Sequence, residues 1–482
     1  MTSSWAKLVS HTSNPRCLLP VLFALVFLYI LIYLLWATPV SHATRRLHTK
    51  SVVSHTFKGS DLSPRTEWSM SGVDKIMPDG EGVWIDGRHI EVMSAIFNVH
   101  SAEDRPKVML PSFLKHSVPR DFVCCIREYP GASKDHQTRA VLEHIDLRFI
   151  ADYQSSTFSC LLPGDSGKIF DSSQPPKYEL ITFAPESCGA NETNPMRIVY
   201  PVRRKFEFAV CTKVAYARLE PVHLVEWFEY MQEVGMSKVV TFHNSLQHDT
   251  RRVFDHYVST GLLELIEYYP RSKSVVFTEA NGQSRQARHD KTLTVTDCQY
   301  RLGGYDFVLT IDFDELPVPQ RPYGTINWVL QDFLRNNSDA SAFRMTPILL
   351  PPDWRSDEVD LYHWTLHKGS YIGQYCIKWA YVPARTKQAA THEHLPKDPY
   401  KPYSLPQEML HFLHFRECKR SWLDVQCASL KPSILNETSL ARFNGRVRHR
   451  LQQIPLQGLV RDSSYVQMVQ SPPRKGDKRK SA

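Results

Sequence analysis

The chain has 482 residues, of which 42% are hydrophobic and 22% charged, and its formal net charge is +8. This length predicts two or three domains with a sizeable core. The basic excess lies at the two ends, because residues 1–60 carry six basic and no acidic side chains and the tail "PRKGDKRK" carries five basic to one acidic. A nucleic-acid binder would carry a basic stripe on its folded part, so the sequence excludes nucleic acid as an expected partner.

An apolar segment lies near the N-terminus. Residues 18–37, "LLPVLFALVFLYILIYLLWA", contain no charged side chain. At about 1.5 Å per residue this run matches the roughly 30 Å hydrocarbon core of a bilayer. It is longer than the apolar core of a cleavable signal peptide, so the sequence predicts a retained transmembrane signal-anchor at 17–40 after a cytosolic tail at 1–16. Residues 41–80, rich in Ser, Thr and His, predict a flexible stem.

Sequons and cysteines follow the apolar run. The sequons are at Asn191, Asn336 and Asn436, and nine cysteines lie beyond the run, none of them in CxxC spacing. Scattered cysteines with sequons indicate a glycoprotein with disulfides in an oxidising compartment, so we expect the bulk of the chain in the secretory lumen, anchored to the membrane. Nine is an odd number, which leaves a thiol free or paired with another chain, and a homodimer therefore stays open.

The sequence of the next segment, 81–204, predicts a series of short strands. Short alternating apolar runs such as "GVWIDGRHIEVMSAIFNVH", "DFVCCIREY" and "YELITFA" are broken by Gly, Pro, Asp and Ser. Short strands between turn signals predict a β-rich accessory module, with a sandwich as the expected form.

The pattern changes at Lys205, where strands begin to alternate with helices. "FEFAVCTKV", "KVVTFHN" and "LLELIEYY" predict strands, while "EPVHLVEWFEYMQEVG", "RRVFDHYVSTG" and "RQARHDKTLTVTDCQYRLGGY" predict helices. This rhythm predicts an α/β domain over 205–460 with a mostly parallel sheet, followed by a basic disordered tail at 461–482. Ligands of such sheets bind beyond the carboxyl ends of the strands.

An acidic cluster stands at one of those ends. In "GYDFVLTIDFDELPVP" an apolar strand is followed by Asp312, Asp314 and Glu315. Residues two apart on a strand share a face, so Asp312 and Asp314 are expected to point the same way and to repel unless a positive charge lies between them. A solvated turn, a glycosidase carboxylate pair and a phosphatase Asp-x-Asp are alternatives. The turn leaves the doubled carboxylate unexplained, a glycosidase pair must flank its sugar, and the phosphatase lacks its further signature residues.

A divalent metal bridging the carboxylates to a diphosphate explains the cluster best. Hard oxygen ligands suit magnesium or manganese, which commonly combine one or two carboxylates with phosphate oxygens. The metal neutralises the carboxylate pair and stabilises a departing nucleoside diphosphate. A nucleotide-binding βαβ half followed by a strand and Asp-x-Asp is the plan of a GT-A glycosyltransferase.

Three segments together resemble glycosyltransferase family 92. They are "HLVEWFEYMQEVGMSKVVTFHN", "TDCQYRLGGYDFVLTIDFDELPVP" and "LHFLHFRE", and the resemblance covers roughly 205–420. Phe415 stands where the family pattern has Tyr. The resemblance implies a single-pass type II enzyme of the Golgi membrane that takes galactose from UDP-galactose. It also implies transfer with inversion to a glycan acceptor, a glycoprotein or polysaccharide, which gives a β-galactoside.

The resemblance also implies roles for residues of the acidic cluster and of the late motif. Asp312 and Asp314 would hold the metal, expected to be manganese, with His414 as a late ligand. Glu315 would support that loop, and Arg416 would lie next to the diphosphate. A satisfied structural histidine is an equally open interpretation of His414.

Strand ends and acceptor-side loops give further candidates. Position alone assigns four residues to the nucleotide, at the ends of the first two strands: Thr212, Lys213, His243 and Asn244. Inversion needs a general base after the metal motif, for which Asp353 in "PPDW" and Glu393 in "THEH" are candidates. Glu226 and Trp227 are expected to be structural. A non-catalytic carbohydrate-binding protein and a transferase with another nucleotide sugar remain alternatives.

Overall fold

The computed structural model describes fourteen stretches of the chain. They are residues 83–85, 90–101, 105–115, 121–128, 136–147, 153–164, 177–184, 187–188, 195–216, 219–269, 285–351, 367–371, 377–416 and 435–471. The predicted cytosolic tail, signal-anchor and stem at 1–16, 17–40 and 41–80 lie outside them.

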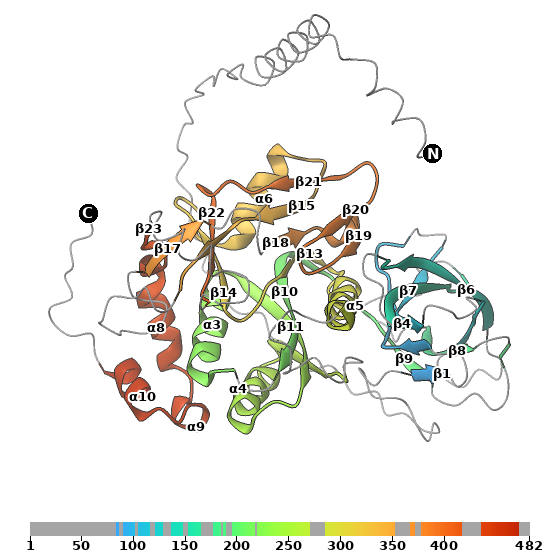
Figure 1. Cartoon of the computed structure of the whole chain (residues 1–482), viewed down its shortest axis with the longest axis horizontal. Coiled ribbons are helices and arrows are strands. Elements are labelled where there is room, and N and C mark those ends of the chain that lie inside the picture. The colour runs from blue at the N-terminus through green and yellow to red at the C-terminus, as the bar shows by residue number, and fades with distance from the viewer. Residues whose placement is uncertain are drawn as a thin grey trace, which may run out of the picture. The chain divides into compact units, whose positions relative to one another are not determined.

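The first strands form a closed barrel (Figure 1). Seven strands close the ring in the order β4-β3-β9-β8-β5-β6-β7, because β7 returns to pair with β4 along nine residues, and β2 and β1 extend from β4. The expected sandwich is therefore wrong. The strands are β1 Val83–Ile85, β2 Ile90–Val92, β3 Ala95–Phe97, β4 Lys107–Lys115, β5 Val123–Glu128, β6 His136–Ile145, β7 Tyr153–Leu161, β8 Tyr178–Ala184 and β9 Met196–Val199.

Alternating side chains fill this barrel. Val108, Leu110 and Leu114 of β4 join the buried cluster inside it, whereas Phe113 of the same strand packs in a different cluster outside. Both faces of β4 are thus covered, which explains its nearly continuous apolar sequence. Disulfides Cys124–Cys160 and Cys125–Cys188 staple the barrel, in agreement with the predicted structural disulfides.

A seven-stranded sheet follows, in the order β12-β11-β10-β13-β18-β15-β21. The strands β12, β11, β10 and β13 are parallel neighbours, but β18 pairs antiparallel with both β13 and β15. The sheet is therefore mixed, and the prediction of a GT-A domain with a mostly parallel sheet is also wrong. Its strands are β10 Arg204–Tyr216, β11 Met236–Asn244, β12 Leu263–Glu267, β13 Tyr305–Thr310, β15 Ala340–Met345, β18 Lys378–Tyr381 and β21 Lys401–Ser404.

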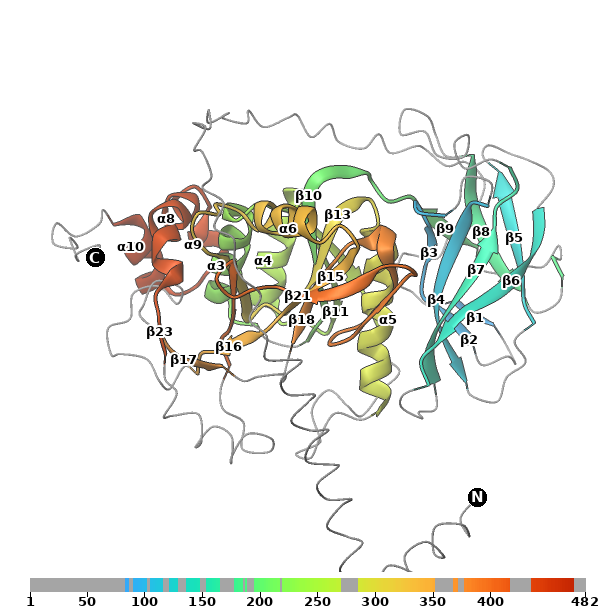
Figure 2. The ribbon, with the colours of Figure 1, turned by 90° about the horizontal axis from the view of Figure 1, so that it is seen from above.

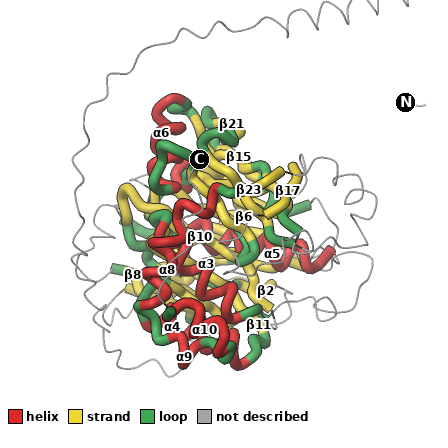
Figure 3. Tube along the Cα trace, turned by 90° about the vertical axis from the view of Figure 1, so that its left-hand side faces the viewer, coloured by secondary structure: helices red, strands yellow, loops and turns green. Residues whose placement is uncertain are grey.

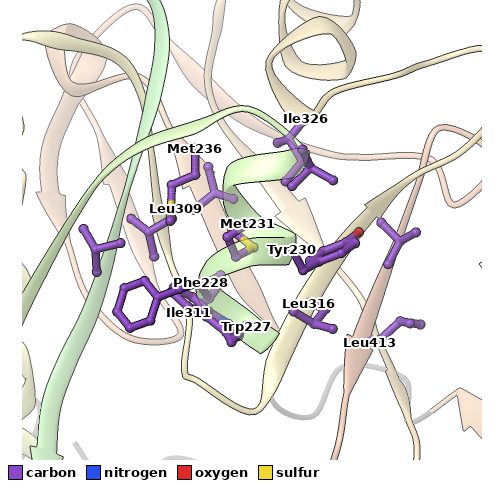
Figure 4. Close-up of a cluster of buried hydrophobic side chains, with 14 of the residues drawn as sticks. Trp227, Phe228, Tyr230, Met231, Met236, Leu309, Ile311, Leu316, Ile326 and Leu413 are labelled. Carbon is purple, nitrogen blue, oxygen red and sulfur yellow. The ribbon is translucent and has the colours of Figure 1, made fainter. Parts of the chain in front are cut away.

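Helices cover the two faces of this sheet. Phe208 and Val210 of β10 pack with α3 (Pro221–Glu233) and α4 (His248–Ser259), whereas Ala209 and Cys211 pack with α5 (Arg285–Arg301) on the other face. Figure 4 shows how Trp227, Tyr230 and other side chains of α3 enter the larger cluster. Buried side chains thus alternate between the two faces along β10 and recur at helical spacing along α3, as the sequence pattern predicts.

A second sheet of five strands, in the order β14-β22-β16-β17-β23, adjoins the first. Strand β14 (Glu315–Pro319) pairs antiparallel with β22 (Leu410–His414), which lies parallel to β16 (Pro347–Leu349). Strand β17 (His367–Tyr371) lies between β16 and β23 (Leu435–Glu437), and the edge strands are β14 and β23. The remaining elements between 326 and 396 are α6 (Ile326–Asn336), the turn η3 (Pro383–Arg385) and the hairpin β19 (Thr386–Ala389) and β20 (His394–Pro396).

The C-terminal helices pack on α3 and α4, where Figure 3 shows them gathered. They are the turn η5 (Ser439–Phe443), α8 (Asn444–Gln452), α9 (Leu456–Leu459) and α10 (Ser463–Gln470). Helix α10 lies inside the segment expected to be a disordered tail and buries Tyr465, Val466 and Val469.

Helix α5 touches both the barrel and the seven-stranded sheet, as Figure 2 illustrates. Ser155 of β7 donates its backbone N–H to His289 Nδ1 at 3.2 Å, and Ser94 Oγ donates to Asp297. The disulfide Cys211–Cys298 joins the helix to β10. These contacts explain why this buried helix keeps so many polar residues, which a period of 3.6 alone would not predict.

A close backbone approach follows α5. A Cβ on Gly304 would stand 2.0 Å from the backbone oxygen of Val202, just before β10. Gly304→Ala is therefore expected to lower the unfolding temperature measurably, since overpacking against backbone costs about 1–3 kcal/mol. Gly324→Ala is the control, because a Cβ there meets nothing within 4 Å. Thermal unfolding checks this, and equal unfolding temperatures for the two variants would contradict the packing argument.

Among the residues that the structure describes, no helix has the length and apolar character needed to cross a bilayer. The expectation of a single-pass Golgi membrane protein therefore finds no support in the described residues. The segment on which that expectation rests, 17–40, is itself not among the described residues.

Candidate active site

The acidic cluster lies where β13 ends and β14 begins. Strand β13 stops at Thr310, and residues 311–314 form a turn that is closed by the backbone N–H of Glu315 donating to the carbonyl of Asp312 at 3.1 Å. Phe313 packs against Trp227 of α3, with ring centroids 4.9 Å apart. The two aspartates flank this anchored ring, but they do not lie on one continuous strand as expected.

Asp314, Glu315 and His414 come together as a possible metal-binding group, since one ligand atom from each lies within 4.8 Å of the others. The β14–β22 register explains this, because Glu315 and His414 are directly opposed across the ladder. His414 Nε2 lies 3.4 Å from Asp314 Oδ2, and His414 Nδ1 lies 3.8 Å from Glu315 Oε1. Only one ring nitrogen of His414 can bind a given ion, and the distance from Nε2 to Asp314 matches the roughly 3–4 Å between two ligands that each lie about 2.1 Å from one ion.

Unsatisfied polar atoms support a metal at this group. Both ring nitrogens of His414 and Oε1 of Glu315 are buried without a hydrogen-bond partner in the structure. Buried polar atoms normally have partners, so each such group asks for an explanation. Two carboxylates and an imidazole are a donor set that a divalent ion such as manganese accepts. The residues therefore fit the metal that the sequence predicts.

Asp312 has different partners from Asp314. Its carboxylate, 38% exposed, lies 2.7 Å from Lys213 Nζ and 2.8 Å from Lys378 Nζ, and both lysine side chains are almost completely buried. Burial by itself would raise the pKa of Asp312, but the two ammonium charges outweigh it and hold that pKa well below its ordinary value. The positive charge beside the first aspartate is thus a pair of lysines. The prediction that Asp312 also ligates the metal remains a prediction.

Glu315 connects the two parts of the site. Its Oε2 accepts from Lys378 Nζ at 2.6 Å and from the backbone N–H of Asp312 at 2.7 Å, which leaves Oε1 toward His414. Trp227 Nε1 donates to the backbone oxygen of Glu315 at 3.0 Å, which gives Trp227 the structural role expected of it. We expected Glu315 only to support the loop, whereas the structure places it among the potential ligands.

Lys213 occupies an unusual backbone position. It lies at a register shift between β10 and β11, and its φ is +60°. Left-handed backbone is rare outside glycine and concentrates at functional sites. Burial lowers the pKa of Lys213, which has one carboxylate partner. Burial also acts on Lys378, but Asp312 and Glu315 outweigh it and raise the pKa of Lys378.

Two further titratable side chains, Lys291 and His392, interact electrostatically with Asp312. Burial, followed by the charge of Lys213, lowers the pKa of Lys291 on α5 to about 8, and Lys378 and Arg416 act in the same direction. Burial and the charge of Lys378 lower the pKa of His392 to about 4, and His392 Nδ1 lies 2.8 Å from the backbone oxygen of Ile377. Sequence reasoning missed Lys378, Lys291 and His392, because no local motif marks them.

The remaining predicted residues are distributed as follows. Thr212 Oγ1 shares a hydrogen bond with Thr241, and the Asn244 amide donates to the backbone oxygen of Tyr268 at 2.9 Å. Burial lowers the pKa of His243 at the end of β11. Glu393 lies in the exposed turn between β19 and β20, next to His392. Glu226 is buried on α3, and Asp353 lies outside the described residues.

Potential metal ligands beside a cluster of lysines suit an enzyme that acts on a phosphorylated substrate. The sequence model of glycosyltransferase family 92 matches residues 206–455, which is more than half of the chain. The chain belongs to glycosyltransferase family 92, and it is a glycosyltransferase.

Two solved structures are remotely similar to the chain. The apo structure of the bifunctional glycosyltransferase WbbM is 11% identical over 36% of this chain and 28% of its own, with a TM-score of 0.20. Residues 1–349 of TarS from S. aureus, in complex with UDP, are 9% identical over 52% of this chain and 73% of theirs, with a TM-score of 0.25. A search of the curated proteins gave no match.

Proposed function

We propose that the chain transfers galactose from UDP-galactose to a glycan acceptor, with inversion, in a metal-dependent reaction that gives a β-galactoside. Family membership supports the transfer chemistry, and the resemblance of the motifs supports this donor. The observation that carries the metal dependence is the group formed by Asp314, Glu315 and His414, whose buried polar atoms lack partners.

The lysines would bind the diphosphate of the donor. Lys213 and Lys378 lie within 2.8 Å of Asp312, and the charge of Arg416 contributes to the lowered pKa of Lys291. A buried ammonium group is a strong point charge for a phosphate. A bound divalent ion would supply Lewis-acid stabilisation of the departing UDP. The lysines would then neutralise the remaining charge and hold the diphosphate in place.

The acceptor hydroxyl needs a base to take its proton, on the side of the sugar opposite the departing UDP. Glu393 remains a candidate among the described residues. The charges of Lys378, Lys213 and Asp312 shift the pKa of the neighbouring His392, which indicates that this turn lies near the site. Asp353 remains a candidate from the sequence alone.

A donor screen tests the proposed function. The purified full chain is incubated with manganese, a mixture of oligosaccharide acceptors and, in turn, UDP-galactose, UDP-glucose, UDP-N-acetylglucosamine or GDP-mannose. Acceptor-dependent release of the nucleoside diphosphate is expected to be fastest with UDP-galactose, and NMR of the product is expected to show a β-linkage. A faster reaction with another donor would overturn the assignment of galactose. Binding without turnover of any donor would favour a non-catalytic carbohydrate-binding protein.

The pKa of Lys291 gives a pH-dependent prediction. A bound diphosphate raises a neighbouring ammonium pKa, so UDP binding at pH 8 is expected to take up protons, about half a proton at most for a group of pKa about 8. Calorimetry in two buffers of different ionisation enthalpy measures this uptake. Lys291→Met should abolish it, whereas Lys387→Met should keep it. Undiminished uptake in Lys291→Met would contradict the placement of Lys291 beside the diphosphate.

A further inference from the structure

A second polar site lies at the other end of the β14–β22 ladder. Glu315 and His414 face each other at one end, and Pro319 and Leu410 at the other. At about 3.3 Å per residue, the four steps to the far end place it about 13 Å from the metal-binding group. A cavity of about 460 Å³ opens there, lined by Gln320, Arg321, Glu408, His411, Ser439 and Arg442 among others. We call it the arginine pocket.

Arg442 carries the argument for a ligand. Its Nε and Nη2 atoms are buried and have no hydrogen-bond partner in the structure. These two atoms form one edge of the guanidinium, whose parallel N–H groups match the two oxygens of a carboxylate, sulfate or phosphate. The face of the guanidinium lies 4.6 Å from the ring centroid of Phe443, which leaves its edge to make polar contacts.

The charges around Arg442 favour an anion. Burial lowers the pKa of Arg442, and the charges of Arg321 and Arg446 lower it further. Arg446 is paired with Glu233 at 2.8 Å, whereas none of the ion pairs among the described residues includes Arg321 or Arg442.

Of the acidic residues near the pocket, Glu437 already has partners and Glu408 is exposed. Glu437 is held by His411 Nδ1 at 2.9 Å and by the backbone N–H of Ser439 at 2.6 Å. Glu408 at the rim is exposed to solvent, where water screens its charge. Arg442, which is partly buried, and Arg321, which is exposed, therefore line the pocket without an acidic partner among the described residues.

We propose that the arginine pocket binds an oxyanion on Arg321 and Arg442, at a site separate from the metal-binding group and not required by the proposed transfer. Gln320 and Ser439, which also line the pocket, offer neutral donors beside the two guanidinium groups. An acidic sugar of a glycan and free inorganic phosphate share the chemistry that such a pocket recognises. The two sources are distinguished by the ligands used in the test.

Isothermal titration of the full chain with glucuronate, inorganic phosphate and glucose tests this inference. We expect saturable binding of at least one anion, weakened at least tenfold in Arg442→Gln and Arg321→Gln, and no binding of glucose. Arg335→Gln is the matched control, because Arg335 is an exposed arginine paired with Asp332. Binding of glucuronate identifies an acidic sugar as the source, and binding of phosphate alone identifies free phosphate.

The outcomes are independent of the transferase reaction. Asp314→Asn should bind the anion with the same affinity as the wild type. The anion test therefore gives a valid result even if Asp314, Glu315 and His414 bind no metal. No saturable binding of either anion, or equal affinity in the wild type, Arg442→Gln and Arg321→Gln, would overturn the arginine pocket. Circular dichroism of each variant confirms that a loss of binding does not come from unfolding.

Discussion

Asp314→Asn and His414→Gln are each expected to lower the transfer rate at least about 1000-fold. A bound metal supplies several kcal/mol of transition-state stabilisation, and about 4 kcal/mol corresponds to a factor of 1000. The asparagine keeps the shape of a side chain that is 44% exposed, and the glutamine replaces a ring without hydrogen-bond partners in the structure. Neither variant should therefore lose its fold. UDP release with saturating donor and acceptor measures the effect.

Asp339→Asn is the control for these variants. Asp339 is exposed, as Asp314 is, and it pairs with Lys401 away from the turn at 311–314. Its transfer rate should match that of the wild type. If Asp314→Asn retained more than a tenth of the wild-type rate with an unchanged unfolding temperature, Asp314 could not be part of the metal-binding group.

Lys378→Met is expected to destabilise the protein by about 3–5 kcal/mol, because it leaves a buried carboxylate without its partner. Lys378 is 1% exposed and Glu315 is fully buried, and their charged atoms lie 2.6 Å apart. The affinity for UDP should fall in parallel if this ammonium group also binds the diphosphate. Chemical denaturation and calorimetry with UDP measure the two effects.

The control for Lys378→Met is the same substitution in an exposed ion pair. Lys401→Met should leave the stability nearly unchanged, since its pair with Asp339 is solvated. Adding Glu315→Gln to Lys378→Met should restore part of the lost stability, because the orphaned charge is removed. A double variant less stable than Lys378→Met alone would show that the ion pair is not the cause.

Local periodicity predicted the elements near the site well. The strand, helix and turn signals between residues 205 and 311 correspond to β10, α3, β11, α4, β12, α5 and β13. The architecture was harder to predict, because it depends on pairings between distant strands. The barrel closes through β4 and β7, and β18 enters the main sheet antiparallel next to β13. Alternation within a strand carries no information about such partners.

The geometry of the acidic cluster also could not be predicted from local sequence. The sequence indicated a charged site and named Asp314 and His414, but the strand alternation was applied to the residues that follow the strand, so both aspartates were expected to point the same way. The turn after Thr310 instead separates Asp312 from Asp314. Lys378, which compensates Asp312, is distant in sequence and becomes its neighbour only through β18.

Titration of the purified full chain with Mn²⁺, followed by the electron paramagnetic resonance signal of the free ion, tests the metal-binding group most directly. It needs neither donor nor acceptor. The account predicts one tightly bound ion per wild-type chain, the same stoichiometry in Asp339→Asn, and loss of the bound ion in Asp314→Asn and His414→Gln. Binding of one Mn²⁺ with unchanged affinity in His414→Gln would contradict the account.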